Sequence, residues 1–74
     1  MAGVQKGNLD DVFTYHKPEG DQPEKYERIR AAGKALAEAI LETTPICGDQ
    51  QAAIRKVREA VFTANAAIAL KGAF

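Results

Sequence analysis

Residues 49–70 read DQQAAIRKVREAVFTANAAIAL and carry the clearest helical pattern in the chain. Apolar side chains recur along this stretch at alternating steps of three and four residues, at Ile54, Val57, Val61, Ala64 and Ile68. This spacing places them on one face of a helix that packs against a partner. We expect Asp49 to cap this helix and Gly72 to end it, with Lys71 complementing the helix dipole.

The same helix is also apolar away from that face. The additional apolar side chains lie mostly in its last three turns, at Ala60, Phe62, Ala66, Ala67, Ala69 and Leu70. A helix that is apolar nearly all round is a buried helix, and one partner helix covers only one side of it. The sequence therefore predicts a homo-oligomer, in which Asn65 sets the register through a hydrogen bond between subunits.

A preceding helix is predicted from Gln22 to about Thr43. Asp21 is the expected N-cap and Glu24 completes the spacing of a capping box. Residues on one face of this helix recur at steps of four, three and four, at Ile29, Gly33, Leu36 and Ile40. Pro45 ends the helix, because the residue before a proline avoids the α conformation.

The fold class that follows is all-α. The short turn at residues 45–48 makes the two helices an antiparallel hairpin. Residues 1–20 are predicted to be an N-terminal arm or short helix that docks on the bundle, because Gly3, Gly7, Pro18 and Gly20 interrupt any regular period. We expect residues 21–74 to be the domain that forms the oligomer and binds the ligand.

Length and cysteine content support association. A chain of 74 residues has one small domain whose own core is marginal. Cys47 is the single cysteine and His16 the single histidine, so neither a disulfide nor a metal site is expected to stabilise it. A free thiol is typical of a reducing cytoplasm.

Net charge and hydropathy argue against two classes of binding partner. Ten basic and ten acidic residues give no net charge, which argues against binding to duplex DNA. No apolar segment is long enough to span a bilayer, and Met1 to Asp11 has no signal-peptide character. We expect neither DNA nor a membrane as partner.

Catalysis is not supported by any motif. Cys47 and His16 are the only obvious nucleophile and base, and they lie on different segments with no signature linking them. There is no glycine-rich phosphate loop. The sequence predicts a protein that is not an enzyme and needs no cofactor.

Two features favour an anion site. Arg30 and Lys34 are four residues apart and share a helix face, whereas Arg28 points elsewhere. Tyr15 offers a ring on which a nucleobase could stack, beside Lys17. The plainer alternatives are a solvated charged helix surface and an aromatic anchor for the arm.

These residues resemble a known family. The pattern Tyr15-His16-x-Pro18, then YERIRxAxKxLAxxI at residues 26–40, Pro45 in the turn and EAVFxANAAIA at residues 59–69, where x is any residue, is similar to the helical-hairpin domain of phage anti-defence sponges. Anti-CBASS and anti-Thoeris sponges share this domain. The similarity extends over about residues 13–70, and ANAAIA near the end is its most distinctive part.

The resemblance implies a compact hexamer, encoded by a phage or prophage, that traps cyclic oligonucleotides between subunits in the cytoplasm of the infected bacterium. It implies that Tyr15 stacks on a base and Arg30 binds a phosphate of a cyclic dinucleotide. The arm residues Thr14, Lys17 and Pro18 would complete that site.

For cyclic trinucleotides the resemblance implies a separate site with Gly33, Lys34 and Lys71. The sequence departs from the family pattern near this site, because Leu70 stands where an arginine is expected and Lys71 follows it. In the other site, Arg30 stands where some members have lysine.

Two alternatives stay open. One is an oligomeric interaction module that binds a host protein through its apolar helix surface or its arm. The other is a sponge for Thoeris-type cyclic ADP-ribose signals; the anti-Thoeris members carry an additional domain for which 74 residues leave no room, so we favour the anti-CBASS interpretation.

Overall fold

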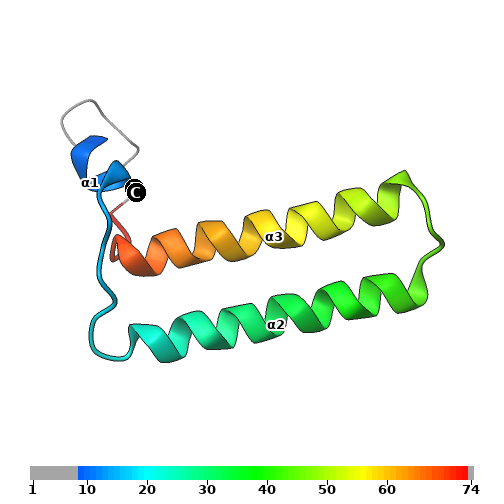
Figure 1. Ribbon diagram of the computed structural model, residues 1–74, viewed down its shortest axis with the longest axis horizontal. Helices are drawn as coiled ribbons and strands as arrows, with labels where there is room; N and C mark the ends of the chain where they lie inside the picture. Colours follow the sequence, from blue (N-terminus) through cyan, green and yellow to red (C-terminus); the bar gives the residue numbers. More distant parts are fainter. Residues whose placement is uncertain (1–8, 74) are drawn as a thin grey trace.

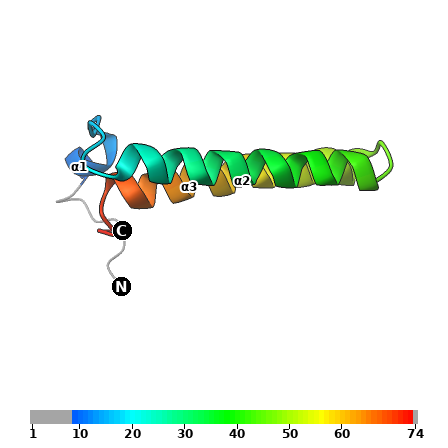
Figure 2. The same ribbon diagram turned by 90° about the horizontal axis from the view of Figure 1, so that it is seen from below.

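The structure, a computed structural model, describes residues 9–73, which form three helices and no strand. They are α1 (Leu9–Phe13), α2 (Gln22–Thr43) and α3 (Gly48–Ala69). Helices α2 and α3 run side by side in opposite directions, and α1 lies at the end where α2 begins and α3 finishes (Figure 1). Seen at right angles, the two long helices form one elongated layer (Figure 2). The predicted all-α helical hairpin is thus confirmed, while the first eight residues of the arm lie outside the described residues.

The start of α2 differs in detail from the predicted capping box. Asp21 is the N-cap residue, but its side chain makes no capping hydrogen bond. Its backbone angles, φ −89° and ψ 4°, are not the extended ones from which a cap side chain reaches back over the first turn. The carboxylate instead lies 3.3 Å from Nζ of Lys25, one turn into the helix.

The turn between the long helices also corrects a prediction. The N-cap of α3 is Cys47 in an extended conformation, not Asp49, which lies within the first turn. Asp49 still favours this helix end, because a carboxylate there faces the positive end of the helix dipole. Gln50 closes the turn: its side-chain amide donates a hydrogen bond to the backbone carbonyl of Thr44 at 3.1 Å.

The predicted facing surfaces of the two helices do meet. Every residue predicted for them is half-buried except Leu36, which is 53% exposed. The helices approach closely at Gly33, where a Cβ atom would lie 2.6 Å from Cγ2 of Val61. The helices therefore pack at a distance that only glycine permits on the α2 side of this contact.

The hairpin has no apolar core of its own. Among the described residues no apolar side chain is buried, and the one buried residue is Gln50, at 4% exposure. Large apolar side chains are exposed on several segments, including Phe13, Ile46 and Phe62. This absence of a core is the feature expected of a subunit that completes its packing with other subunits.

The C-terminal end of α3 closes with a Schellman motif. The backbone N–H of Gly72 bonds to the carbonyl of Ala67 at 3.0 Å, and that of Lys71 bonds to the carbonyl of Ile68 at 3.2 Å. Gly72 was predicted to end the helix, yet the residue at the left-handed position of the motif is Lys71, with φ 54°; Gly72 follows with φ 75°. A side chain at such a position is strained relative to glycine.

No helix in residues 9–73 is long and apolar enough to cross a membrane.

Candidate functional site

The arm is tied to the end of α3 at its base. Nζ of Lys71 lies 3.1 Å from a carboxylate oxygen of Glu19. The side chain of Gln22 accepts a hydrogen bond from the backbone N–H of Glu19 at 2.9 Å and donates one to the carbonyl of Ile68 at 3.0 Å. These contacts join the base of the arm, the first residue of α2 and the last turn of α3.

The predicted arm residues lie beyond this anchor and are open to solvent. Tyr15 is 80% exposed, and Thr14, Lys17 and Pro18 are also exposed. The hydroxyl of Thr14 donates a hydrogen bond to the carbonyl of Asp10 at 2.5 Å, which ends the short helix α1. The ring of Tyr15 therefore remains free to stack on another group.

His16 has a structural role in the arm. Its Nε2 atom lies 2.6 Å from the carbonyl oxygen of Asp11. Asp11 and His16, together with Leu70 and Lys71, line a small cavity of about 230 Å³ between the arm and the end of α3. The candidate trinucleotide residue Lys71 thus faces the arm and not the middle of the hairpin.

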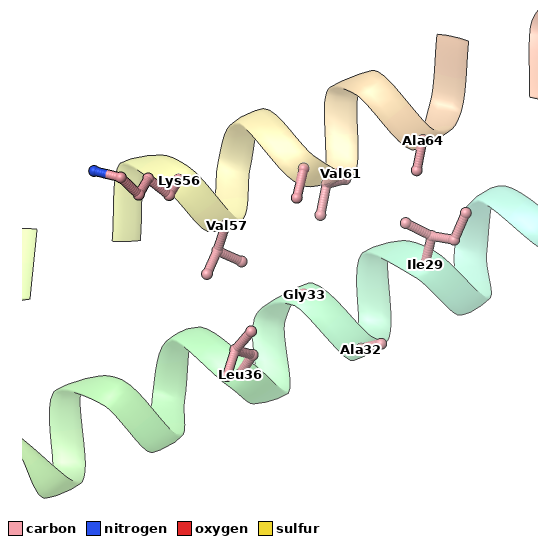
Figure 3. Close-up of a pocket in the computed structure, with 9 residues that line it drawn as sticks. Ile29, Ala32, Gly33, Leu36, Lys56, Val57, Val61 and Ala64 are labelled. Carbon is pink, nitrogen blue, oxygen red and sulfur yellow. The ribbon is translucent and has the colours of Figure 1, made fainter. Parts of the chain in front are cut away.

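One face of the hairpin has a wide apolar groove of about 500 Å³. Val57 and Val61 project from α3 towards Gly33 in its floor (Figure 3). The groove is lined by Ile29, Ala32, Gly33, Leu36, Lys56, Val57, Ala60, Val61 and Ala64. Lys56 is the one charged residue of this set, so the surface suits an apolar partner.

A second groove, of about 280 Å³, has a mostly apolar surface bordered by three basic residues. We call it the basic groove. Its charged residues are Arg30 and Lys34 from α2 and Arg58 from α3, and Phe62 borders it. The floor consists of Gly33, Ala37, Ile54, Val57 and Val61. Arg30 and Lys34 are thus brought together, as predicted from their spacing.

Arg58 and Phe62 were missed by the sequence reasoning. The guanidinium carbon of Arg58 lies 5.8 Å from the centre of the Phe62 ring, within the range of a cation–π interaction. Their spacing of four residues places them on one helix face, but only the pairing of α2 with α3 puts that face beside Arg30. To predict that Arg58 lies beside Arg30, one would need the register of the two helices, in which Gly33 lies against Val61.

Neither predicted residue set comes together within one chain. Arg30 is eight residues into α2, roughly 12 Å along the axis from the helix start that carries the arm. Lys71 is held at that same end by Glu19, whereas Gly33 and Lys34 lie about 16 Å or more along α2. These separations along α2 are consistent with sites that residues of a second hairpin complete.

The thiol and the imidazole cannot act as a pair within one chain. Cys47 is exposed in the turn at the far end of the hairpin from the arm that carries His16 (Figure 1). Among the described residues, no group of three or more His, Cys, Asp or Glu side chains could hold a metal ion.

Comparison with known proteins identifies the family. No curated protein and no solved structure shows a significant match to the chain. The family model of the Acb2/Tad1 hairpin domain, however, matches residues 5–69, a span that takes in all three helices. The family is known for sequestering cyclic nucleotide signals, as a binding sponge rather than an enzyme. On this match the chain belongs to the Acb2/Tad1 hairpin-domain family, and the resemblance inferred from its sequence is confirmed.

Proposed function

We propose that this protein is a phage anti-defence sponge that binds cyclic oligonucleotide second messengers, foremost cyclic dinucleotides, and withholds them from CBASS immune effectors without cleaving them. The observation that carries the proposal is the basic groove, with Arg30 and Lys34 side by side, in a hairpin that also presents the exposed ring of Tyr15. Its place of action would be the cytoplasm of the infected bacterium.

The chemistry of the ligand fits these side chains. A cyclic dinucleotide carries two phosphodiester charges and two bases. The Arg30 guanidinium can bind a phosphate through two parallel hydrogen bonds, and Lys34 adds a point charge. Stacking of a base on Tyr15 would contribute about 1–3 kcal/mol. Thr14, Lys17 and Pro18 would flank the stacked base.

We propose that the ligand binds between subunits. The arm that carries Tyr15 joins α2 at its start, and Arg30 lies roughly 12 Å further along the helix, which supports a site that takes the two residues from two hairpins. A cyclic dinucleotide has approximate two-fold symmetry, and a two-fold interface presents each residue twice, once to each half of the ligand. The missing apolar core supports a homo-oligomer, and we propose the hexamer implied by the family resemblance.

A second site for cyclic trinucleotides is proposed at Gly33, Lys34 and Lys71. Within one chain Lys71 is paired with Glu19. A trinucleotide that engages Lys71 must therefore displace this carboxylate, whose 67% exposure makes the pair weak.

The apolar groove favours a second candidate function. Its size and lining suit an amphipathic helix of a host protein, in which case the hairpin would be an interaction module. A third candidate is a sponge for cyclic ADP-ribose signals, since the matched domain is shared with Tad1.

Isothermal titration with cyclic di-adenylate, cyclic tri-adenylate and cyclic ADP-ribose in parallel separates these candidates. We expect tight binding of the dinucleotide at a simple fraction of a site per chain. Heat only with cyclic ADP-ribose would favour the third candidate, and no heat with any ligand would favour the interaction module. Ligand recovered intact after denaturation of the complex would support sequestration, whereas cleaved ligand would refute it.

Matched variants test the site itself. Tyr15→Ala should weaken dinucleotide binding at least tenfold, since a two-fold site loses two stacked rings of about 1–3 kcal/mol each and about 1.4 kcal/mol corresponds to a factor of ten. Phe13→Ala is the control, because it removes an equally exposed aromatic ring from the same arm. For Arg30→Ala the control is Arg28→Ala, an exposed arginine of α2 outside both grooves. Equal effects of variant and control would contradict the assigned site.

A further inference from the structure

We propose that Arg58 is a phosphate-binding residue of the basic groove, so that a bound cyclic nucleotide bridges α2 and α3 of one hairpin. This inference rests on the proposed function and extends the predicted dinucleotide site, whose basic residues are Lys17 on the arm and Arg30 on α2, to the second long helix.

The geometry of the groove supports this role. Arg30 and Lys34 lie on its α2 side and Arg58 on its α3 side, in a volume of about 280 Å³. The Phe62 ring stands 5.8 Å below the Arg58 guanidinium carbon, and such a ring restricts the arginine to fewer conformations. A guanidinium held in this way loses less freedom when it binds an anion.

The charge balance points to an anion. Three cations line one groove, and Lys34 alone is paired, at 3.9 Å from a carboxylate oxygen of Glu38 on an exposed surface. Within residues 9–73 no carboxylate forms an ion pair with Arg30 or Arg58. The three cations are exposed at the borders of the groove, and a phosphate placed between them would contact positive charge from both helices.

The apolar groove, which shares Gly33, Val57 and Val61 with the basic groove, serves as an internal comparison. Both surfaces are mostly apolar, but the apolar groove has only one charged residue, Lys56. A phosphodiester is therefore expected in the smaller groove, where two helices contribute guanidinium groups. Arginine suits this position because its planar donors match two phosphate oxygens.

The test measures cyclic di-adenylate affinity by isothermal titration for Arg58→Gln, Arg58→Lys and the control Arg55→Gln. Arg55 is an exposed arginine of the same helix outside both grooves. Loss of a hydrogen bond to a charged group is worth about 1.5–3 kcal/mol, so Arg58→Gln should weaken binding about tenfold or more. Arg58→Lys should retain part of the affinity, and Arg55→Gln should change it less than twofold.

Chemical protection provides a second readout that does not depend on how the variants fold. In the wild-type protein, modification of Arg58 by phenylglyoxal, followed by mass spectrometry, should slow when cyclic di-adenylate is added, while modification of Arg55 should not. Equal protection of the two arginines would overturn the inference.

Failure of the inference is distinguishable from failure of the proposed function. Wild-type affinity in Arg58→Gln, together with lost affinity in Arg30→Ala, would overturn the role of Arg58 and leave the sponge function intact. No binding of the dinucleotide by the wild-type protein would overturn both. Equal losses in Arg58→Gln and Arg55→Gln would show a general charge effect and would also overturn the inference.

Discussion

Gly33→Ala should destabilise the hairpin although alanine is the better helix former. The added Cβ would lie 2.6 Å from Cγ2 of Val61, whereas ordinary van der Waals contacts are 3.4–4 Å. The helices would have to separate by about 1 Å, or Val61 would have to leave its side-chain conformation, which is stiff because it is branched at Cβ.

The gain in helix propensity and the cost of overfilling the contact can both be estimated. Replacing glycine by alanine inside a helix gains roughly 0.5–1 kcal/mol of helix stability. Overfilling a packed contact costs about 1–3 kcal/mol. The difference of these terms ranges from about 0 to 2.5 kcal/mol, and we expect a net loss of about 1 kcal/mol for Gly33→Ala.

The assay is urea denaturation followed by circular dichroism at one fixed protein concentration, since association contributes to the measured stability. Gly48→Ala is the matched control, because Gly48 is also helical and a Cβ there has no atom within 4 Å. A double-mutant cycle with Val61→Ala isolates the contact: removing Cγ2 should relieve the clash and give a coupling of about 1 kcal/mol or more.

The result that would refute this reasoning is specific. If Gly33→Ala were as stable as the wild-type protein and showed no coupling to Val61→Ala, the close approach of α2 and α3 at this point would not limit the fold. A loss of stability in Gly48→Ala as large as that in Gly33→Ala would likewise remove the contact as its cause.

Three further predictions concern stability and register. Lys71→Gly should raise the free energy of unfolding by about 1 kcal/mol, because it removes a side chain from a left-handed backbone position. The same change should weaken trinucleotide binding. Thermal denaturation measures the stability and titration the binding, and an unchanged stability would contradict backbone strain at Lys71. Gln50→Ala should cost about 1 kcal/mol by leaving the carbonyl of Thr44 without its donor, which urea denaturation would detect; a stability equal to that of the wild-type protein would contradict this role. The buried Oδ1 of Asn65 has no hydrogen-bond partner within the described residues, and we assign it one in a neighbouring subunit. Asn65→Val should therefore change the distribution of oligomers measured by mass photometry or native mass spectrometry. An unaltered distribution would refute the assignment.

Much of the fold could be predicted because it depends on local patterns. The period of Ile54, Val57 and Val61 and the proline at position 45 are local signals, and the helix bounds predicted from them lie within two residues of those observed. The details of the caps could not be predicted in the same way. Asp21 and Asp49 have the right chemistry for caps, but the turn geometry and the competing contact with Lys25 decide what each does.

The candidate site was predictable only where it lies on one helix. Arg30 and Lys34 share a face through their spacing, so the sequence was enough. Arg58 joins them through the packing of α3 on α2, which depends on a close contact at Gly33 that no local pattern reveals. The placement of Tyr15 relative to Arg30 depends on neighbouring subunits and stays a prediction.

The lack of a buried apolar core among the described residues of the hairpin affects how ligand-binding capacity depends on protein concentration. If each chain completes its fold by association, the folded fraction follows a power of the total chain concentration, as in other proteins whose stability is inseparable from assembly. Ligand capacity would then rise more steeply than the amount of protein synthesised, with little capture below a threshold and nearly full capture above it. Ligand binding at subunit contacts would lower that threshold, so the signal itself would promote assembly of the protein that removes it.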